Sequence, residues 1–234
     1  MDGWVPALVG AVVGLCGGWC VPWVIAWCPD PATNPEENPD DFPDHVPFAQ
    51  LAARRGLGAR CAVACAVAGA GLGALLGWGW ALLWLLPLVP VFCALTVIDY
   101  VTWYLPKRLV FCGAGLVLVL EVVATIALKE PSVLAWAGAG FVALGGYYGL
   151  LWFISPRMMA FGDVRLGALI GLALGPLGAG TLLVSVFAAA VLAVVGLLPM
   201  RSKGAMIRRH VPYGPFLVLG ALVAVAVAQI VTAG

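Results

Sequence analysis

Two aspartates in long apolar segments are the residues of this chain best suited to chemistry. Asp99 lies in VIDYVTWYLPKRL and Asp163 lies in MMAFGDVRLGALIGLALG. A carboxylate at the edge of hydrocarbon is costly, so an acid in such a segment marks a candidate functional site. Two facing carboxylates share one proton, and the ionised member can take a proton from water while the protonated member polarises a peptide carbonyl. The pair therefore fits hydrolysis by an acid dyad, with neither a metal nor a covalent intermediate.

The composition indicates that these aspartates belong to a polytopic membrane protein. Of the 234 residues, 63% are hydrophobic and 10% are charged, which excludes an ordinary soluble domain. A membrane helix needs roughly 20 apolar residues. Eight segments approach this length: 4–27, 61–78, 81–98, 109–128, 133–154, 164–178, 181–200 and 213–232. The sequence predicts an all-α, polytopic membrane helical bundle of about eight transmembrane helices, of which the sixth is short.

The distribution of basic residues predicts how these helices are oriented. Eleven of the twelve Lys and Arg residues fall on one side of the eight-helix topology, and Lys129 falls on the other. Because cytoplasmic loops carry an excess of basic residues, those loops would be cytoplasmic and both termini would lie outside. Asp99 and Asp163 would then both lie at cytoplasmic helix ends and at the same depth.

A long acidic loop separates the first helix from the other seven. Residues 1–60 would form the first transmembrane helix and a Pro-rich cytoplasmic loop, and residues 61–234 would form a seven-helix core of the same membrane domain. The loop carries Asp40, Asp41 and Asp44 among its acids. It is a solvated surface loop, a surface that attracts a basic peptide, or a site for Ca²⁺ or Mg²⁺. The spacing of its acids matches no EF-hand pattern for a bound cation.

Three motifs together resemble the type IV prepilin peptidases, which are membrane aspartic peptidases. Asp99 is followed by an aromatic-rich turn and by LPKR, Asp163 lies in FGDVRL, and VPYGPFL opens the last apolar segment. The resemblance covers most of the chain from about residue 61 onward. It implies that Asp99 and Asp163 are the catalytic pair and that Gly162 gives the backbone room beside Asp163. It also implies that the protein cleaves the leader of a prepilin or pseudopilin at the cytoplasmic face of a bacterial inner membrane.

The chain departs from the family in ways that narrow the expected activity. Ala160 replaces the first glycine of the second motif, and Arg165 replaces its lysine. Members that also methylate the new N-terminus carry two Cys-x-x-Cys pairs in the first cytoplasmic loop, and this loop has none. The chain is therefore expected to resemble the peptidase-only form that serves tight-adherence pili, without methyltransferase activity, metal or cofactor. Its seven cysteines are expected to be small buried packing residues.

A glycine stripe predicts one close helix contact. Gly167, Gly171 and Gly175 recur at every fourth position, and such small residues let a neighbouring helix approach closely. The stripe serves either general helix packing or a contact that fixes Asp163 against segment 81–98.

Glu121 is compatible with a different class of function. It lies inside segment 109–128, where we expect it to be buried and hydrogen-bonded to a neighbouring helix. Intramembrane acids also relay protons or bind ions in carriers, so a proton-coupled secondary transporter is one alternative. A catalytically silent pilus or secretion assembly protein is another. The basic loop at 201–209 would contact the lipid bilayer rather than nucleic acid.

Overall fold

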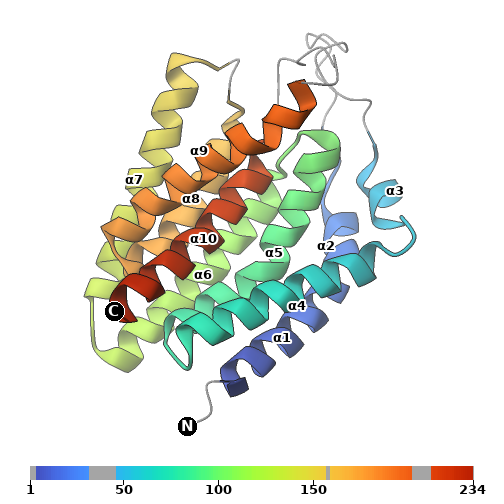
Figure 1. Ribbon diagram of the computed structural model, residues 1–234. Helices are drawn as coiled ribbons and strands as arrows, with labels where there is room; N and C mark the ends of the chain where they lie inside the picture. The colour runs from blue at the N-terminus through green and yellow to red at the C-terminus, as the bar shows by residue number, and fades with distance from the viewer. Residues whose placement is uncertain (1–3, 32–45, 157–158, 202–211, 234) are drawn as a thin grey trace.

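The computed structural model describes residues 4–31, 46–156, 159–201 and 212–233, and these residues form an all-α bundle without a strand (Figure 1). The helices are α1 Trp4–Trp19, α2 Val21–Trp27, α3 Phe48–Ala52, α4 Leu57–Leu76, α5 Ala81–Thr102, α6 Lys107–Leu128, α7 Ser132–Ile154, α8 Phe161–Leu174, the 3-10 helix η2 Gly175–Leu177, α9 Ala179–Arg201 and α10 Gly214–Ala233. The prediction of an all-α polytopic bundle is confirmed. The start of α1 and the end of α10 both lie toward the lower edge of Figure 1.

Six of the described helices are long and apolar enough to cross a membrane: α4, α5, α6, α7, α9 and α10. The first predicted segment is two helices, because α1 and α2 meet at Cys20 with a bend of 41°. Taken as one broken span, this pair would make seven. The break is followed by Pro22, which fits the first turn of a helix but cannot donate a backbone hydrogen bond within a continuous one.

The sixth predicted segment is the short central helix α8. It has 14 residues, of which the 12 residues Gly162–Val164 and Leu166–Leu174 are buried. A 14-residue helix is about 21 Å long, which is shorter than the roughly 30 Å of bilayer hydrocarbon. Because other helices surround α8, protein rather than lipid covers most of its surface. Its two exposed or half-exposed residues, Phe161 and Arg165, lie in its first two turns.

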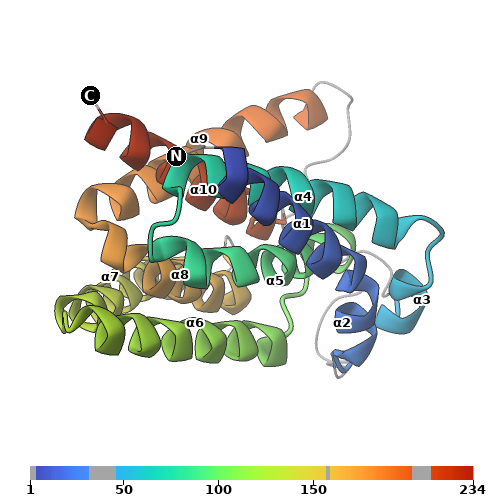
Figure 2. The ribbon, with the colours of Figure 1, turned by 90° about the horizontal axis from the view of Figure 1, so that it is seen from below.

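Helix α1 packs closely along α4 through glycines on both helices. Figures 1 and 2 show the two helices side by side. A Cβ on Gly10 would overlap the carbonyl of Gly69, and a Cβ on Gly14 would overlap the carbonyl of Cys65. The two backbones therefore touch, as is typical of small-residue helix contacts in membranes. This contact joins α1 to α4.

The predicted glycine stripe on α8 faces α7 rather than α5. A Cβ on Gly171 would overlap the carbonyl of Gly140, and a Cβ on Gly167 would overlap the ring of Tyr148. The expectation that this stripe fixes Asp163 against α5 is therefore wrong. The stripe faces α7, which offers a small residue, Gly140, at the point of closest approach.

The acidic residues Asp40, Asp41 and Asp44 lie outside the described residues. The described ends of their loop meet, since the backbone N–H of Phe48 donates a 2.8 Å hydrogen bond to Oδ1 of Asp30. Phe48 belongs to the short helix α3, whose Phe48 and Leu51 side chains are buried.

Candidate functional site

Asp99 lies in the last turn of α5 and is fixed by the start of α10. Helix α5 continues past Asp99 to Thr102 and ends at Trp103, whose φ of 54° is left-handed. The Asp99 side chain is 4% exposed. Its Oδ2 accepts a 2.9 Å hydrogen bond from the backbone N–H of Gly214. Two of the three motifs, 115 residues apart in sequence, therefore meet at this carboxylate.

Asp163 lies in the first turn of α8 and is held by its own helix start. Its side chain is 5% exposed. The backbone N–H of Ala160, the residue before the helix, donates a 3.3 Å hydrogen bond to Oδ2 of Asp163. A carboxylate is favoured at a helix N-terminus, where the unpaired N–H groups carry partial positive charge. Asp163 is thus a buried acid with a fixed orientation.

The structure brings the two predicted aspartates into one buried cluster. Both side chains are buried, and Leu105, in the segment that follows Asp99, packs against Gly162, the residue before Asp163, so the helix ends that carry the two carboxyl groups meet. Tyr148 from α7 packs against Gly167, one turn after Asp163, and Tyr213 directly precedes Gly214, which contacts Asp99. Tyr148 was not anticipated from the sequence. The only signal for it was a pair of hydroxyl-bearing aromatics, YY at 147–148, inside an apolar helix.

Gly162 provides room beside Asp163, but for a reason other than an unusual backbone angle. It is helical, and the glycines with positive φ among the described residues lie elsewhere. A Cβ on Gly162 would lie 2.9 Å from Cβ of Leu105, in the segment that follows Asp99. Gly162 therefore allows the Asp99 segment to pack directly on the start of α8.

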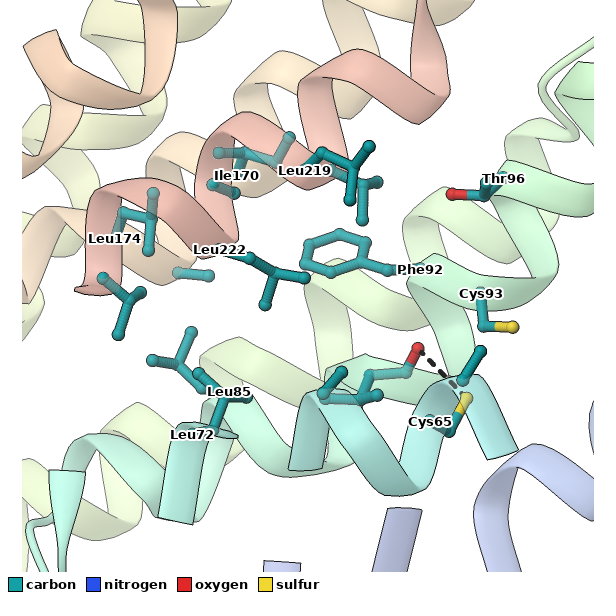
Figure 3. Close-up of a pocket in the computed structure, with 17 residues that line it drawn as sticks. Cys65, Leu72, Leu85, Phe92, Cys93, Thr96, Ile170, Leu174, Leu219 and Leu222 are labelled. Atoms are coloured by element: carbon teal, nitrogen blue, oxygen red, sulfur yellow. Dashed lines mark hydrogen bonds between the residues drawn. The ribbon is translucent and has the colours of Figure 1, made fainter. Parts of the chain in front are cut away.

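An apolar cavity of about 190 Å³ lies between α4, α5, α8 and α10 (Figure 3). Phe92, Ile170 and Leu222 project into it from α5, α8 and α10. Thr96, one turn before Asp99, lines the same cavity, and its buried Oγ1 has no hydrogen-bond partner among the described residues. The cavity thus begins about one turn from the carboxyl cluster and separates the two helices that carry it.

One hydrogen bond ties α5 to α8 across this gap. The indole N–H of Trp84 donates a 3.0 Å hydrogen bond to the carbonyl oxygen of Ala173. Trp84 is buried and lies four turns before Asp99 on α5, so this contact closes the gap far from the two carboxyl groups. The helices are therefore held together at one end of the gap and by α10 at the other.

Glu121 is buried on α6 without the partner that we expected. Its side chain is fully buried, and neither carboxyl oxygen has a hydrogen-bond partner among the described residues. The buried hydroxyl of Thr125, one turn later, also has no partner there. The prediction that Glu121 is buried is confirmed, but the predicted hydrogen bond to a neighbouring helix is wrong. A buried polar group without a partner costs free energy.

We therefore expect Glu121→Leu to stabilise the protein. The change replaces an unpaired buried carboxyl group with an apolar side chain of similar size. This should raise the free energy of unfolding by about 1–3 kcal/mol. The measurement is the apparent melting temperature in detergent, taken as the temperature at which heating removes the monodisperse peak of the protein in size-exclusion chromatography. Val123→Leu, an exposed change on the same helix, is the control. A lower melting temperature for Glu121→Leu would mean that Glu121 holds a partner.

The described residues contain no group of three His, Cys, Asp or Glu side chains that could hold a metal ion. All seven cysteines are described, and all are free thiols. The expectation that they are buried is confirmed for Cys28, Cys61 and Cys65, whereas Cys93 is half-buried. It is wrong for the exposed residues Cys16 of α1, Cys20 at the α1–α2 bend and Cys112 of α6. In an apolar segment such positions face lipid, where a thiol serves as a small hydrophobic group.

The chain matches no protein-family model, no curated protein and no solved structure.

Proposed function

We propose that this protein is a membrane aspartic endopeptidase that removes the leader of prepilin-like proteins at the cytoplasmic face of a bacterial inner membrane. One observation carries the proposal: Asp99 and Asp163 come from different helices, both are buried, and the helix ends that carry them pack together through Leu105 and Gly162. The resemblance of three motifs to the type IV prepilin peptidases supports the same function. The contacts of Asp99 with Gly214 and of Leu105 with Gly162 join those three motifs around the cluster.

The chemistry needs one proton shared between the two carboxyl groups. The ionised aspartate takes a proton from a water molecule, and the protonated aspartate donates a hydrogen bond to the carbonyl oxygen of the scissile peptide. The water oxygen attacks the carbonyl carbon, and the proton then passes to the leaving nitrogen. Hydrogen bonds from the backbone of Gly214 and Ala160 hold the carboxyl groups for this exchange.

The apolar cavity suits a substrate with a hydrophobic segment beside the cleaved bond. It starts near the carboxyl cluster, it is lined almost entirely by apolar side chains, and it follows α5 and α8 into the bundle. A leader followed by a membrane helix could place the scissile bond at the aspartates and the following apolar residues in the cavity. The hydroxyl of Thr96, which has no hydrogen-bond partner among the described residues, offers a hydrogen bond to a peptide backbone there.

The function is tested by a cleavage assay with the purified full chain in proteoliposomes. Substrates are several prepilin-like proteins with a basic leader and a following hydrophobic helix. The products are separated by gel electrophoresis, and the new N-terminus is sequenced. A single new N-terminus directly before the hydrophobic segment supports the proposal, whereas intact substrate in every case contradicts it.

The buried acid Glu121 makes a proton-coupled transporter the second candidate. Carriers place such acids near the middle of the membrane, where broken helices line a path. Proton uptake by the same proteoliposomes, abolished by Glu121→Gln and accompanied by no cleavage, would favour the carrier. Cleavage that survives Glu121→Gln would favour the peptidase. A silent assembly protein would show neither activity.

Gly214→Ala should reduce cleavage by about 100-fold. The added Cβ would lie 2.7 Å from Oδ2 of Asp99, so the carboxylate must move, and a displacement of about 1 Å in a catalytic group can cost this much. The measurement is kcat/KM for leader cleavage. Gly115→Ala is the control, since a Cβ there meets no atom within 4 Å. Equal rates for the two variants would show that the position of Asp99 does not limit the reaction.

Asp40, Asp41 and Asp44 are proposed to attract the basic leader. Changing all three to Lys should raise KM for a basic leader by about tenfold at low salt, because long-range attraction increases local substrate concentration. The same variant should leave KM unchanged for a substrate whose leader has been neutralised. An unchanged KM for the basic leader would contradict the proposal that these aspartates attract it.

A further inference from the structure

A second, polar pocket lies at the ends of helices α2, α6 and α8, apart from the apolar cavity. It encloses about 420 Å³. Its described lining includes three basic residues, Lys107, Arg108 and Arg165, with Tyr104 and Asp30. Lys107 and Arg108 begin α6, and Arg165 comes from the second turn of α8. Side chains that are far apart in sequence therefore converge on one small volume.

The electrostatics of this pocket favour an anion. Pro106 and Lys107 line the pocket where α6 starts, so the positive end of a 22-residue helix faces it together with three cationic side chains. Asp30 is the acid in the described lining, and its Oδ1 already accepts the backbone N–H of Phe48 at 2.8 Å. Among the described lining residues, three positive charges and a helix start outweigh that one carboxylate.

Two of the three basic side chains lie against aromatic rings at the same end of the bundle. The guanidinium of Arg108 lies 5.1 Å from the ring centre of Trp27. That of Arg165 lies 5.3 Å from the ring centre of Phe161, and its Nε also donates to the carbonyl oxygen of Phe161 at 3.4 Å. Cation–π contacts of this kind orient an arginine without neutralising its charge.

The surface next to the pocket is suited to lipid rather than water. Trp23 and Trp27 of α2 are 68% and 54% exposed, and Phe111, one turn after Lys107 on α6, is 62% exposed. Trp side chains are enriched at the boundary between hydrocarbon and head groups. The pocket therefore lies at head-group depth, and an exposed apolar surface runs from its edge along α2 and α6.

We infer that this pocket binds the phosphate of an anionic phospholipid head group, with the acyl chains against the exposed aromatic residues of α2 and α6. Basic pockets between transmembrane helices are typical sites for such head groups. Lys107, Arg108 and Arg165 would contact the phosphate, and the phenol of Tyr104 would donate to the head group. This inference does not rest on the proposed peptidase function, although the pocket borders the segments that carry Asp99 and Asp163.

The test is native mass spectrometry of the full chain in detergent, titrated with phosphatidylglycerol, with phosphatidylcholine of the same acyl chains, and with inorganic phosphate. We expect phosphatidylglycerol to be retained at least tenfold more tightly than phosphatidylcholine. K107Q/R108Q/R165Q should weaken phosphatidylglycerol binding roughly 100-fold, because each basic residue near an anionic lipid contributes a factor of roughly five. Equal retention of the two lipids by the wild type would overturn the inference.

Two controls make the result specific to the pocket. R54Q/R55Q/R60Q removes the same number of charges from exposed residues that do not line the pocket, and should change binding less than threefold. If the two triple variants lose equal affinity for phosphatidylglycerol, the lipid responds only to the total charge of the protein, and the inferred site is contradicted. Displacement of the lipid by an equal concentration of inorganic phosphate would show a site for the free anion instead. If the pocket variant does not accumulate, R108Q alone should weaken binding about fivefold, and an unchanged affinity would count against the inference.

Discussion

Asp99→Asn and Asp163→Asn should each reduce leader cleavage by about 10³-fold to 10⁴-fold, while the protein still accumulates in the membrane. An amide can neither take the proton of the attacking water nor donate a carboxyl proton to the scissile carbonyl, and acid–base catalysis contributes up to about 10⁴-fold. Either change alone should suffice, because each step needs both groups. The measurement is the rate of appearance of the new N-terminus under single-turnover conditions.

The fold should survive these two changes. The asparagine side chain has the same shape as aspartate, and its amide oxygen can still accept the N–H of Gly214 or of Ala160. Glu130→Gln, at an exposed acid outside the cluster, is the control and should cleave at the wild-type rate. If either aspartate variant cuts normally, that residue is structural and the two-aspartate mechanism fails. A double variant no slower than each single variant would agree with two groups that act as one unit.

Gly140→Leu should destabilise the bundle by about 3 kcal/mol or more. A Cβ on Gly140 would overlap the carbonyl of Gly171 and lie 2.8 Å from Cα of Gly175, so the backbones of α7 and α8 would have to separate. No rotamer of a larger side chain avoids this, since the clash begins at Cβ. We expect the apparent melting temperature in detergent to fall by about 10 °C, or the protein to fail to accumulate.

Gly138→Leu is the matched control for this prediction. It lies two residues away on the same helix, is exposed, and has no atom within 4 Å of the position of a Cβ. Both changes replace a helical glycine with leucine, so the gain in helix propensity is the same. Gly138→Leu should leave the melting temperature unchanged or raise it. If both variants melt alike, the close contact between α7 and α8 does not support the fold.

The sequence predicts a helix correctly where a long apolar run determines it, as in α6 and α7. The boundary between α1 and α2 was not predictable, because a proline in this chain does not always mark the end of a helix. Pro22 follows a break, whereas Pro87 and Pro90 lie inside the continuous helix α5. Neighbouring helices in a membrane can tolerate a proline within a span, and the sequence of one helix does not show which neighbours it has.

The distribution of basic residues predicted that Asp99 and Asp163 lie at the same end of the helix bundle, and both aspartates lie in one cluster there. The contact that fixes Asp99 was not predictable, because it is made by the backbone N–H of Gly214, which carries no signature in the sequence. The partner of the glycine stripe was also missed. Gly171 shows that some helix comes close, but only the packing shows that the helix is α7.

The enclosure of α8 has a consequence for how the chain enters the membrane during synthesis. With 14 residues and with Asp163 and Arg165 near its start, α8 is a poor segment for insertion by itself, since a charged residue in a lipid-exposed helix opposes insertion by a few kcal/mol. The 23-residue helix α7 precedes it and offers the glycine face that receives it. We therefore expect α8 to leave the translocon as one half of a hairpin with α7, so that the aspartate is buried by its neighbour before it meets lipid.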